Sequence, residues 1–128
     1  KSLLAIWNLG LPLACLIIAL GLNEPVKRGK SLDFLRKKTV DIALLQETHL
    51  KIADVHRCQN RHYMIAASSS APNKTKGVSV LIKRNLKLNI LESGADTNGK
   101  FCFIKCNFDS VKILILVSSD QSTFFHGW

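Results

Sequence analysis

The chain alternates between continuous apolar runs and polar segments. Residues 16–20 are apolar without interruption, which is typical of a strand that is buried on both faces. Residues 40–45 form a second such run, in which Asp41 is the one charged position. Because the segment between the two runs has helical spacing, this order predicts a βαβ unit with two parallel strands.

The segment between these runs predicts an amphipathic helix. Asn23 can cap the helix, and Pro25 suits its first position. Three apolar positions would form the buried stripe: Val26, Leu32 and Leu35. Cations cover the rest of the helix, namely Lys27, Arg28, Lys30, Arg36, Lys37 and Lys38. This pattern is consistent with a solvated basic face and also with a face that contacts phosphate.

The second half of the chain predicts strands joined by short turns. Asn98-Gly99 marks one turn, and the two-residue link Asp109-Ser110 predicts a hairpin. The predicted strands are residues 63–67, 77–82, 86–91, 100–108 and 111–118. Since no linker or repeat separates these elements, the whole pattern predicts one α/β domain with a strand-rich second half.

Residues 3–22 carry no charge, and this segment allows two interpretations. An apolar run of this length could span a bilayer or belong to a signal peptide. However, Pro12 and the glycines at positions 10 and 21 interrupt the run. The interruptions favour a buried strand over a membrane span.

Composition narrows the class of protein. The 128 residues are 47% hydrophobic, which excludes a disordered or collagen-like chain and fits one domain. Lys and Arg number 18 against 9 Asp and Glu, so the net charge is +9. This excess indicates a polyanionic partner, either nucleic acid or an acidic membrane surface. Cys102 and Cys106 would share one face of a strand, and the wide spacing of the cysteines predicts reduced thiols in an intracellular protein, nuclear or cytoplasmic.

Glu47 is the main candidate for chemistry. It follows the predicted strand 40–45, and its neighbours are Gln46, Thr48 and His49. Open α/β sheets place their ligands at the carboxyl ends of strands. A carboxylate there suits Mg²⁺, which takes one or two protein carboxylates and completes its shell with water and phosphate oxygens. The alternative interpretation is a surface charge without a ligand.

Other residues do not form a second candidate site. His49, His56 and His62 have no second cluster of metal ligands near them in the sequence, so we expect surface or partly buried histidines. Glycine-rich phosphate loops and the nucleophile elbow of hydrolases are absent from the sequence.

Four segments together resemble a known family. They are residues 21–28 (GLNEPVKR), 41–50 (DIALLQETHL), 77–82 (GVSVLI) and 96–101 (DTNGKF). They are similar to the LINE-1-type retrotransposon endonuclease, which belongs to the endonuclease/exonuclease/phosphatase superfamily with exonuclease III and the apurinic/apyrimidinic endonucleases. The order and spacing agree from Gly21 to about Leu116. The resemblance divides the chain into a divergent apolar segment, residues 1–15, and a truncated domain, residues 16–128.

The resemblance implies a fold and an activity. The expected fold class is α/β, as half of a four-layered α/β sandwich of the DNase I type, with a mixed sheet and flanking helices. The implied activity is Mg²⁺-dependent hydrolysis of DNA phosphodiester bonds. Glu47 would be the catalytic and metal-binding residue, with Gln46 and Asn23 in support. Lys27, Arg28 and Lys30 would contact DNA, and no protein or membrane partner is expected.

Other positions depart from the pattern of the family. Ile18 and Leu20 stand where the family has asparagines, and Val117 stands where it has a tyrosine. Asp120 replaces another asparagine, and the motifs that bring the catalytic Asp and His would lie beyond Trp128. We therefore expect catalysis by this chain to be impaired. A basic nucleic-acid-binding remnant without catalysis is the alternative function.

Overall fold

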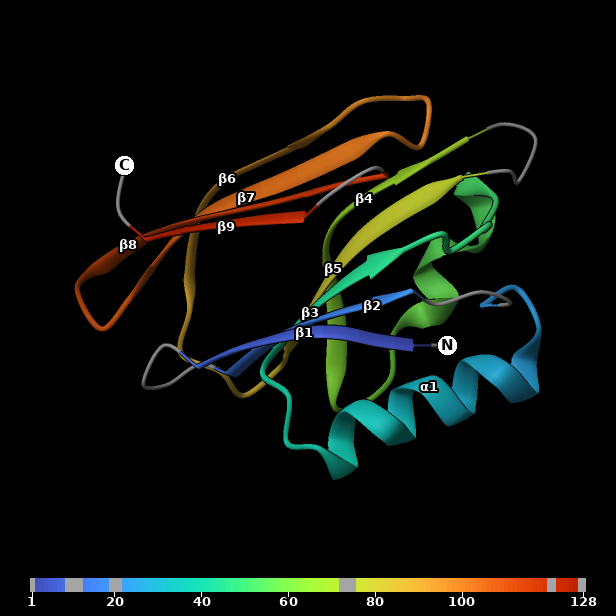
Figure 1. Ribbon diagram of the computed structural model, residues 1–128, viewed down its shortest axis with the longest axis horizontal. Coiled ribbons are helices and arrows are strands. Elements are labelled where there is room, and N and C mark those ends of the chain that lie inside the picture. Colours follow the sequence, from blue (N-terminus) through green and yellow to red (C-terminus); the bar gives the residue numbers. More distant parts are fainter. Residues whose placement is uncertain (1, 9–12, 19–21, 72–75, 120–121, 127–128) are drawn as a thin grey trace.

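The computed structural model describes the backbone of residues 2–8, 13–18, 22–71, 76–119 and 122–126, and the side chains of residues 22–71 and 76–119. Two sheets account for its strands (Figure 1). The first has the order β1-β2-β3-β5-β4, and the second has the order β6-β7-β8-β9. The elements in chain order are β1 (Ser2–Asn8), β2 (Leu13–Ile18), α1 (Pro25–Lys37), β3 (Ile42–Gln46), η1 (Ile52–Cys58), β4 (Tyr63–Ser70), β5 (Gly77–Lys83), β6 (Asn89–Ala95), β7 (Phe101–Phe108), β8 (Val111–Ser118) and β9 (Ser122–His126).

The predicted βαβ unit is confirmed. Strands β2 and β3 are parallel, with Leu16 opposite Leu44, and α1 connects them. Pro25 opens the helix as predicted, but the predicted cap is wrong. The cap is Glu24, whose carboxylate accepts hydrogen bonds from the amides of Val26 (3.0 Å) and Lys27 (3.3 Å). A carboxylate at this position also stabilises the positive end of the helix dipole, which explains why it replaces Asn23.

The expected α/β class is wrong, because the structure is mostly β. Residues 22–71 and 76–119 are 46% strand and 21% helical. Within these ranges, β3-β5-β4 and β6-β7-β8 are the antiparallel three-stranded parts of the two sheets, and α1 is one helix of a few turns. They do not form half of a four-layered α/β sandwich. The pairs β4–β5, β6–β7 and β7–β8 are antiparallel because each is joined by a short connection, whereas a parallel pair needs a long crossover.

The main core lies between the two sheets. It contains residues from β3 and β5 on one side and from β7 and β8 on the other: Ile42, Leu44, Val78, Val80, Ile82, Cys102, Ile104, Cys106, Ile113, Ile115 and Val117. Because side chains alternate along each strand, every second residue of β7 and β8 points into this core.

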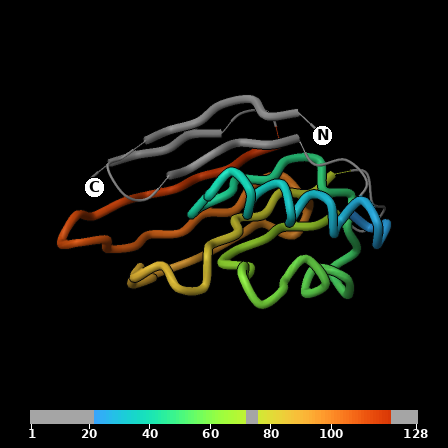
Figure 2. Tube along the Cα trace, turned by 90° about the horizontal axis from the view of Figure 1, so that it is seen from below, coloured from blue at the N-terminus to red at the C-terminus, as the bar shows by residue number. Residues whose placement is uncertain are grey.

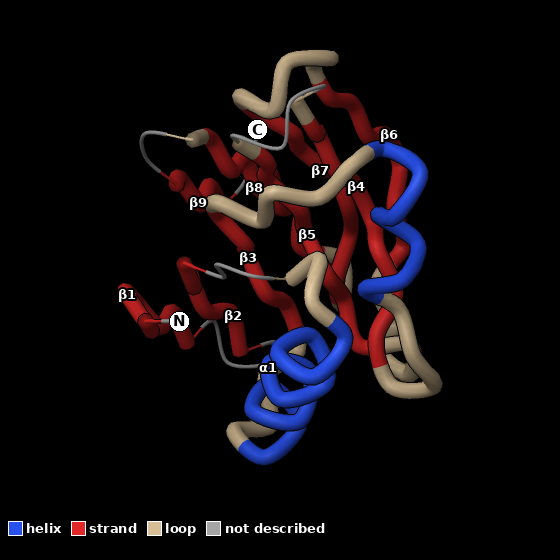
Figure 3. Tube along the Cα trace, turned by 90° about the vertical axis from the view of Figure 1, so that its right-hand side faces the viewer, coloured by secondary structure: helices blue, strands red, loops and turns tan. Residues whose placement is uncertain are grey.

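A second core covers the other face of the first sheet. Helix α1 contributes Leu32 and Leu35, and η1 contributes Cys58, against the sheet residues Ala43 and Leu81. The view in Figure 2 is from the side of α1, and Figure 3 shows both helical segments in blue. The predicted helix stripe is therefore right at its last two positions. It is wrong at Val26, which is 62% exposed.

Strand boundaries differ from prediction at several places. β1 and β9 were not predicted, and β2 begins at Leu13 rather than at residue 16. β4 runs on to Ser70, and β6 begins at Asn89 rather than at Leu86. Leu86 and Leu88 are apolar because they pack against the core from a loop, not because they belong to a strand. The predicted hairpin at Asp109-Ser110 is confirmed, since both residues have positive φ (52° and 66°), as a two-residue turn of this kind requires.

The predicted state of the thiols is confirmed for the cysteines whose side chains are described. Cys58, Cys102 and Cys106 are free and buried, and the last two lie on the same face of β7. Burial raises the pKa of Cys102 to about 12 and that of Cys58 to about 11. Because the thiolate is the nucleophilic form, these are structural side chains.

Candidate functional site

One end of the two sheets collects the predicted site and several polar side chains. Gln46 at the end of β3 lies opposite Val78, near the start of β5, and Val78 also lies opposite Ser69 of β4. On the second sheet, Ser118 at the end of β8 lies opposite Phe101. We call this region the Glu47 end and define it as residues 46–50 with Ser69, Ser70, Gly77, Asp96 and Ser118.

Gln46 joins the two sheets at this end. Its side chain is buried, with 6% exposed, and its amide nitrogen Nε2 donates a hydrogen bond to the Ser118 carbonyl at 2.7 Å. Such a bond satisfies a buried amide and holds the end of β3 against the end of β8. Gln46 therefore positions the backbone that leads into Glu47.

Glu47 is exposed and has an uncommon backbone conformation. Its φ is 53°, and His49 has a φ of 54°. Left-handed conformations are uncommon for residues other than glycine, and those that persist are held by their surroundings. The buried residue between them, Thr48, is 0% exposed, and its amide donates to the Gly77 carbonyl at 3.2 Å. Packing on both sides of Glu47 thus fixes the backbone position from which its exposed side chain extends.

Thr48 and Gly77 approach each other closely. A Cβ atom added to Gly77 would lie 2.2 Å from Oγ1 of Thr48, so only glycine fits there. Gly77 also has a φ of 152°, a backbone conformation that residues with a side chain rarely adopt. Oγ1 of Thr48 is buried without a hydrogen-bond partner among the described residues. This contact makes the Glu47 end tightly packed but polar.

Asp96 organises the loop that leads into β7. Oδ1 of its carboxylate accepts hydrogen bonds from the amides of Lys100 and Phe101, both at 3.1 Å, and from the hydroxyl of Ser69. Burial acts to raise the pKa of Asp96, but the hydrogen bonds from Ser69 and from the backbone outweigh it and lower the pKa below the usual value. The amide of Gly99 donates to Oγ of Ser69 at 2.9 Å.

A cleft opens beside this network. It has a volume of about 330 Å³, and its lining combines side chains of η1, β4 and the loop after β6: Ile52, Val55, Ser68, Ser69, Ser70, Asp96 and Thr97. Ser69 and Asp96 form a hydrogen bond with each other in its wall.

The described residues fit a complete Mg²⁺ site poorly. Ranges 22–71 and 76–119 contain no group of three or more His, Cys, Asp or Glu residues that could hold a metal ion. At the Glu47 end, Asp96 uses its carboxylate for the loop, which leaves Glu47 as the carboxylate that faces solvent. One carboxylate holds Mg²⁺ only with help from water and phosphate oxygens. His49 and His62 are half-buried and His56 is exposed.

The other predicted site residues lie around the start of α1. Asn23 is exposed and precedes the cap residue Glu24. Lys27 and Lys30 are exposed, whereas Arg28 is half-buried and donates from Nη1 to the Leu22 carbonyl at 3.1 Å. Arg28 therefore holds the chain that enters the helix.

The structure describes two of the four positions that depart from the family pattern, Ile18 and Val117. Val117 is 0% exposed and packs in the core between the sheets, so a tyrosine hydroxyl is missing there. Ile18 is the last residue of β2 and lies opposite Gln46. Leu20 and Asp120 lie outside the described residues.

The sequence did not reveal two features of the site. The network of Ser69, Asp96 and Gly99 joins residues that are 27 and 30 positions apart, and the Asp-Thr-Asn-Gly turn was its one local signal. Thr48 and Gly77 likewise meet through the pairing of β3 with β5. Both depend on sheet register, which a single sequence does not show.

A search against protein families adds no identification. No family model matches the chain. Among the described residues, no helix is long and apolar enough to cross a membrane. The family resemblance therefore stands on the motifs around residues 21–28, 41–50, 77–82 and 96–101.

Proposed function

We propose that this chain is a domain of the endonuclease/exonuclease/phosphatase superfamily, of the LINE-1 endonuclease type, which binds DNA and in which phosphodiester hydrolysis is impaired. The observation that supports this proposal is the placement of Glu47. It is an exposed carboxylate at the end of a buried strand, held by the buried side chains of Gln46 and Thr48 on either side. This is where the family motif requires its metal-binding glutamate.

When bound, Mg²⁺ would supply Lewis-acid polarisation of a phosphodiester. Glu47 would contribute one carboxylate to the ion, and Gln46 would position Glu47 through its bond to Ser118. With one protein carboxylate the affinity would be low, and water and DNA phosphates would supply the other ligands. The buried Val117 offers no hydroxyl to the phosphate, which further weakens catalysis.

The first experiment measures metal binding directly. Mn²⁺ replaces Mg²⁺ and broadens the NMR signals of nearby amides. We expect broadening centred on residues 46–50 that disappears in Glu47→Gln. Glu92→Gln, which removes an exposed carboxylate of β6, is the matched control and should leave the broadening unchanged. Broadening that persists in Glu47→Gln would contradict the proposal.

The second experiment measures nicking of supercoiled plasmid in Mg²⁺ and in EDTA. We expect little nicking from the chain and none above background from Glu47→Gln. Equal and rapid nicking by both proteins would exclude a catalytic role for Glu47.

A second candidate function is binding to nucleic acid without catalysis, in the nucleus or cytoplasm. It is favoured by the excess of 18 Lys and Arg over 9 Asp and Glu. For binding of this kind, the logarithm of the affinity falls linearly with the logarithm of the salt concentration. An affinity for DNA that does not change with salt would exclude this function.

A further inference from the structure

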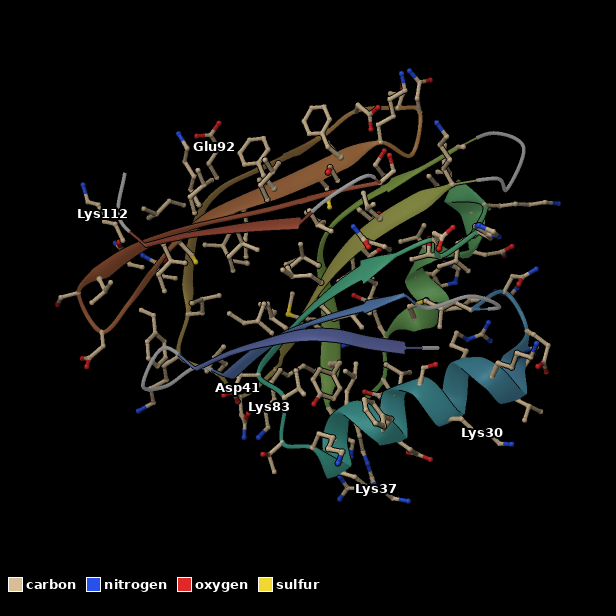
Figure 4. The ribbon with its side chains drawn as sticks, viewed as in Figure 1. Lys30, Lys37, Asp41, Lys83, Glu92 and Lys112 are labelled. Atoms are coloured by element: carbon tan, nitrogen blue, oxygen red, sulfur yellow. The ribbon has the colours of Figure 1, made fainter. Side chains whose placement is uncertain are left out.

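A cluster of cations lies at the opposite end of the first sheet from Glu47. We call it the basic end. It consists of residues from the last turn of α1 and its C-cap, from the start of β4 and from the end of β5: Arg36, Lys37, Lys38, Arg61, Lys83 and Arg84. Figure 4 shows Lys83 beside Asp41, on the side of the molecule where Lys37 marks the end of α1. Glu92 and Lys112 lie on the other sheet.

Strand register brings these residues together. Lys83 lies opposite Tyr63, and the amide of Lys83 donates to the Asp41 carbonyl at 2.8 Å. The amide of Arg84 donates to the His62 carbonyl at 2.8 Å, and Nε of Arg84 donates to the Asn60 carbonyl at 2.7 Å. The backbone on both sides of Arg61 is therefore tied to the end of β5.

The end of α1 is tied to the same place. The hydroxyl of Tyr63 donates to the Val40 carbonyl at 2.6 Å, which fixes the link between α1 and β3. The groups around His62 confirm the convergence. Partial burial lowers its pKa, and so do the charges of Arg36, Arg61 and Lys83, whereas Asp33 acts to raise it.

Few acids offset this charge. Asp33 and Asp41 are the acids beside the basic end. Within the described ranges the ion pairs are Arg57–Asp54 and Lys105–Glu92, and neither includes a cation of this cluster. Five of the six cations are exposed, and Lys83 is half-buried. Like charges held together without an ion pair among the described residues raise the local potential and favour a polyanion.

From this arrangement we infer that the basic end is a docking surface for the phosphate backbone of double-stranded DNA. A membrane fits less well, because peripheral membrane surfaces combine cations with exposed apolar side chains. The large exposed apolar side chains among the described residues, Val26, Ile52, Leu91 and Phe101, lie elsewhere. Single strands also fit less well, since Tyr63 is buried and Phe34 is half-buried against the second core, with Nζ of Lys38 6.0 Å from its ring centroid.

This surface is separate from the proposed metal site. Asp41 and Glu47 are six residues apart along β3, and at a rise of about 3.3 Å per residue the two ends are about 20 Å apart. The inference rests on the DNA binding of the proposed function and names a surface at which DNA would bind without a metal ion. Failure of one does not imply failure of the other.

The experiment measures binding of a 30-base-pair duplex of arbitrary sequence by fluorescence anisotropy, in EDTA, over a range of salt concentrations. The test variant is Arg36→Gln/Lys37→Gln/Arg61→Gln. If all three residues contact phosphates, the slope of log affinity against log salt falls by about 2 to 3, and affinity at about 0.1 M salt falls about a hundredfold.

The matched control removes the same charge at the Glu47 end, with Lys51→Gln/Lys76→Gln/Lys100→Gln. All three lysines are exposed. We expect the slope to change by less than about 1. An equal or larger loss in this control would overturn the inference, since binding would then follow net charge or the other end.

Two further measurements guard against unfolding and against a different ligand. Arg36→Lys/Arg61→Lys keeps the charge and should keep the affinity, so a loss in this variant overturns the phosphate-contact interpretation. Vesicles with about 30% anionic lipid provide the membrane comparison. Tighter binding to these vesicles than to the duplex, with the same dependence on Arg36, Lys37 and Arg61, also overturns the inference.

Discussion

The two ends of the first sheet are built in different ways. At the Glu47 end, a glycine, a buried threonine hydroxyl and two residues with positive φ fix the backbone that carries one exposed carboxylate. At the basic end, ordinary backbone hydrogen bonds bring six cations together, and their side chains remain mostly exposed. One end positions a single group by tight packing, whereas the other gathers charge. Substitutions that perturb packing should therefore act mainly at the Glu47 end.

The largest effect is expected from Gly77→Ala. The new Cβ would meet Oγ1 of Thr48 at 2.2 Å, and both Gly77 and Thr48 are buried. Overpacking of this kind costs about 1 to 3 kcal/mol of the free energy of unfolding. Chemical denaturation measures it. Gly29→Ala is the control, because nothing lies within 4 Å of its added Cβ and it lies inside α1. It should stabilise the protein by about 0.5 to 1 kcal/mol. Equal effects of the two substitutions would contradict the tight packing of Gly77 against Thr48 at the Glu47 end.

Tyr63→Phe should have the next largest effect, and it acts at the basic end. It removes the hydroxyl that donates to the Val40 carbonyl and leaves that buried carbonyl without this partner. The expected loss in the free energy of unfolding is about 1 to 2 kcal/mol. Thermal unfolding measures the change. An unchanged melting temperature would show that the link between α1 and β3 does not depend on this bond.

Thr48→Val should raise stability. It replaces a buried hydroxyl that has no partner among the described residues by a methyl group of similar size. The expected gain is about 1 kcal/mol, because an unsatisfied buried polar group is removed. Denaturation with urea measures it, and Thr48→Ser, which keeps the hydroxyl, is the comparison. A loss in Thr48→Val would mean that the hydroxyl is satisfied after all, by water or by a ligand.

The smallest effect is the pH dependence that Asp96 contributes. Its pKa is lower in the folded protein than its usual value, so its hydrogen bonds stabilise the fold above the unfolded pKa. This stabilisation is lost as pH falls through the folded pKa. Urea midpoints at pH 6 and below pH 3 should therefore differ less for Asp96→Asn than for the native chain. The same difference in both proteins would exclude this role of Asp96.

Much of the local structure followed from the pattern of the sequence. β8 was predicted residue by residue, because alternating apolar positions and a two-residue turn leave one register for the hairpin. The start of α1 at Pro25 and the parallel pair β2–β3 were also predicted. β6 was misplaced, because Leu86 and Leu88 reach the core from a loop and imitate a strand in their spacing.

The fold class was predicted wrongly for a related reason. One βαβ unit and a family resemblance were extended to the whole domain, although the later strands are joined by short links that allow only antiparallel pairing. Glu47, Gln46, Asn23 and the cations of α1 could be named as candidates from the sequence. Their chemical roles stay predictions, since a motif names residue types and does not show which neighbours lie beside them.

The sequence alone determined the strand that leads to Glu47, the helix before that strand, the buried free thiols and the excess of positive charge. These features depend on local periodicity and on composition. Only the tertiary structure decided that Thr48 packs on Gly77, that Gln46 bonds to Ser118, and that Arg61 and Lys83 join the cations at the end of α1. Each of these contacts joins residues far apart in the chain, and the register between strands sets them. A shift of one residue would turn every side chain of a strand to its other face.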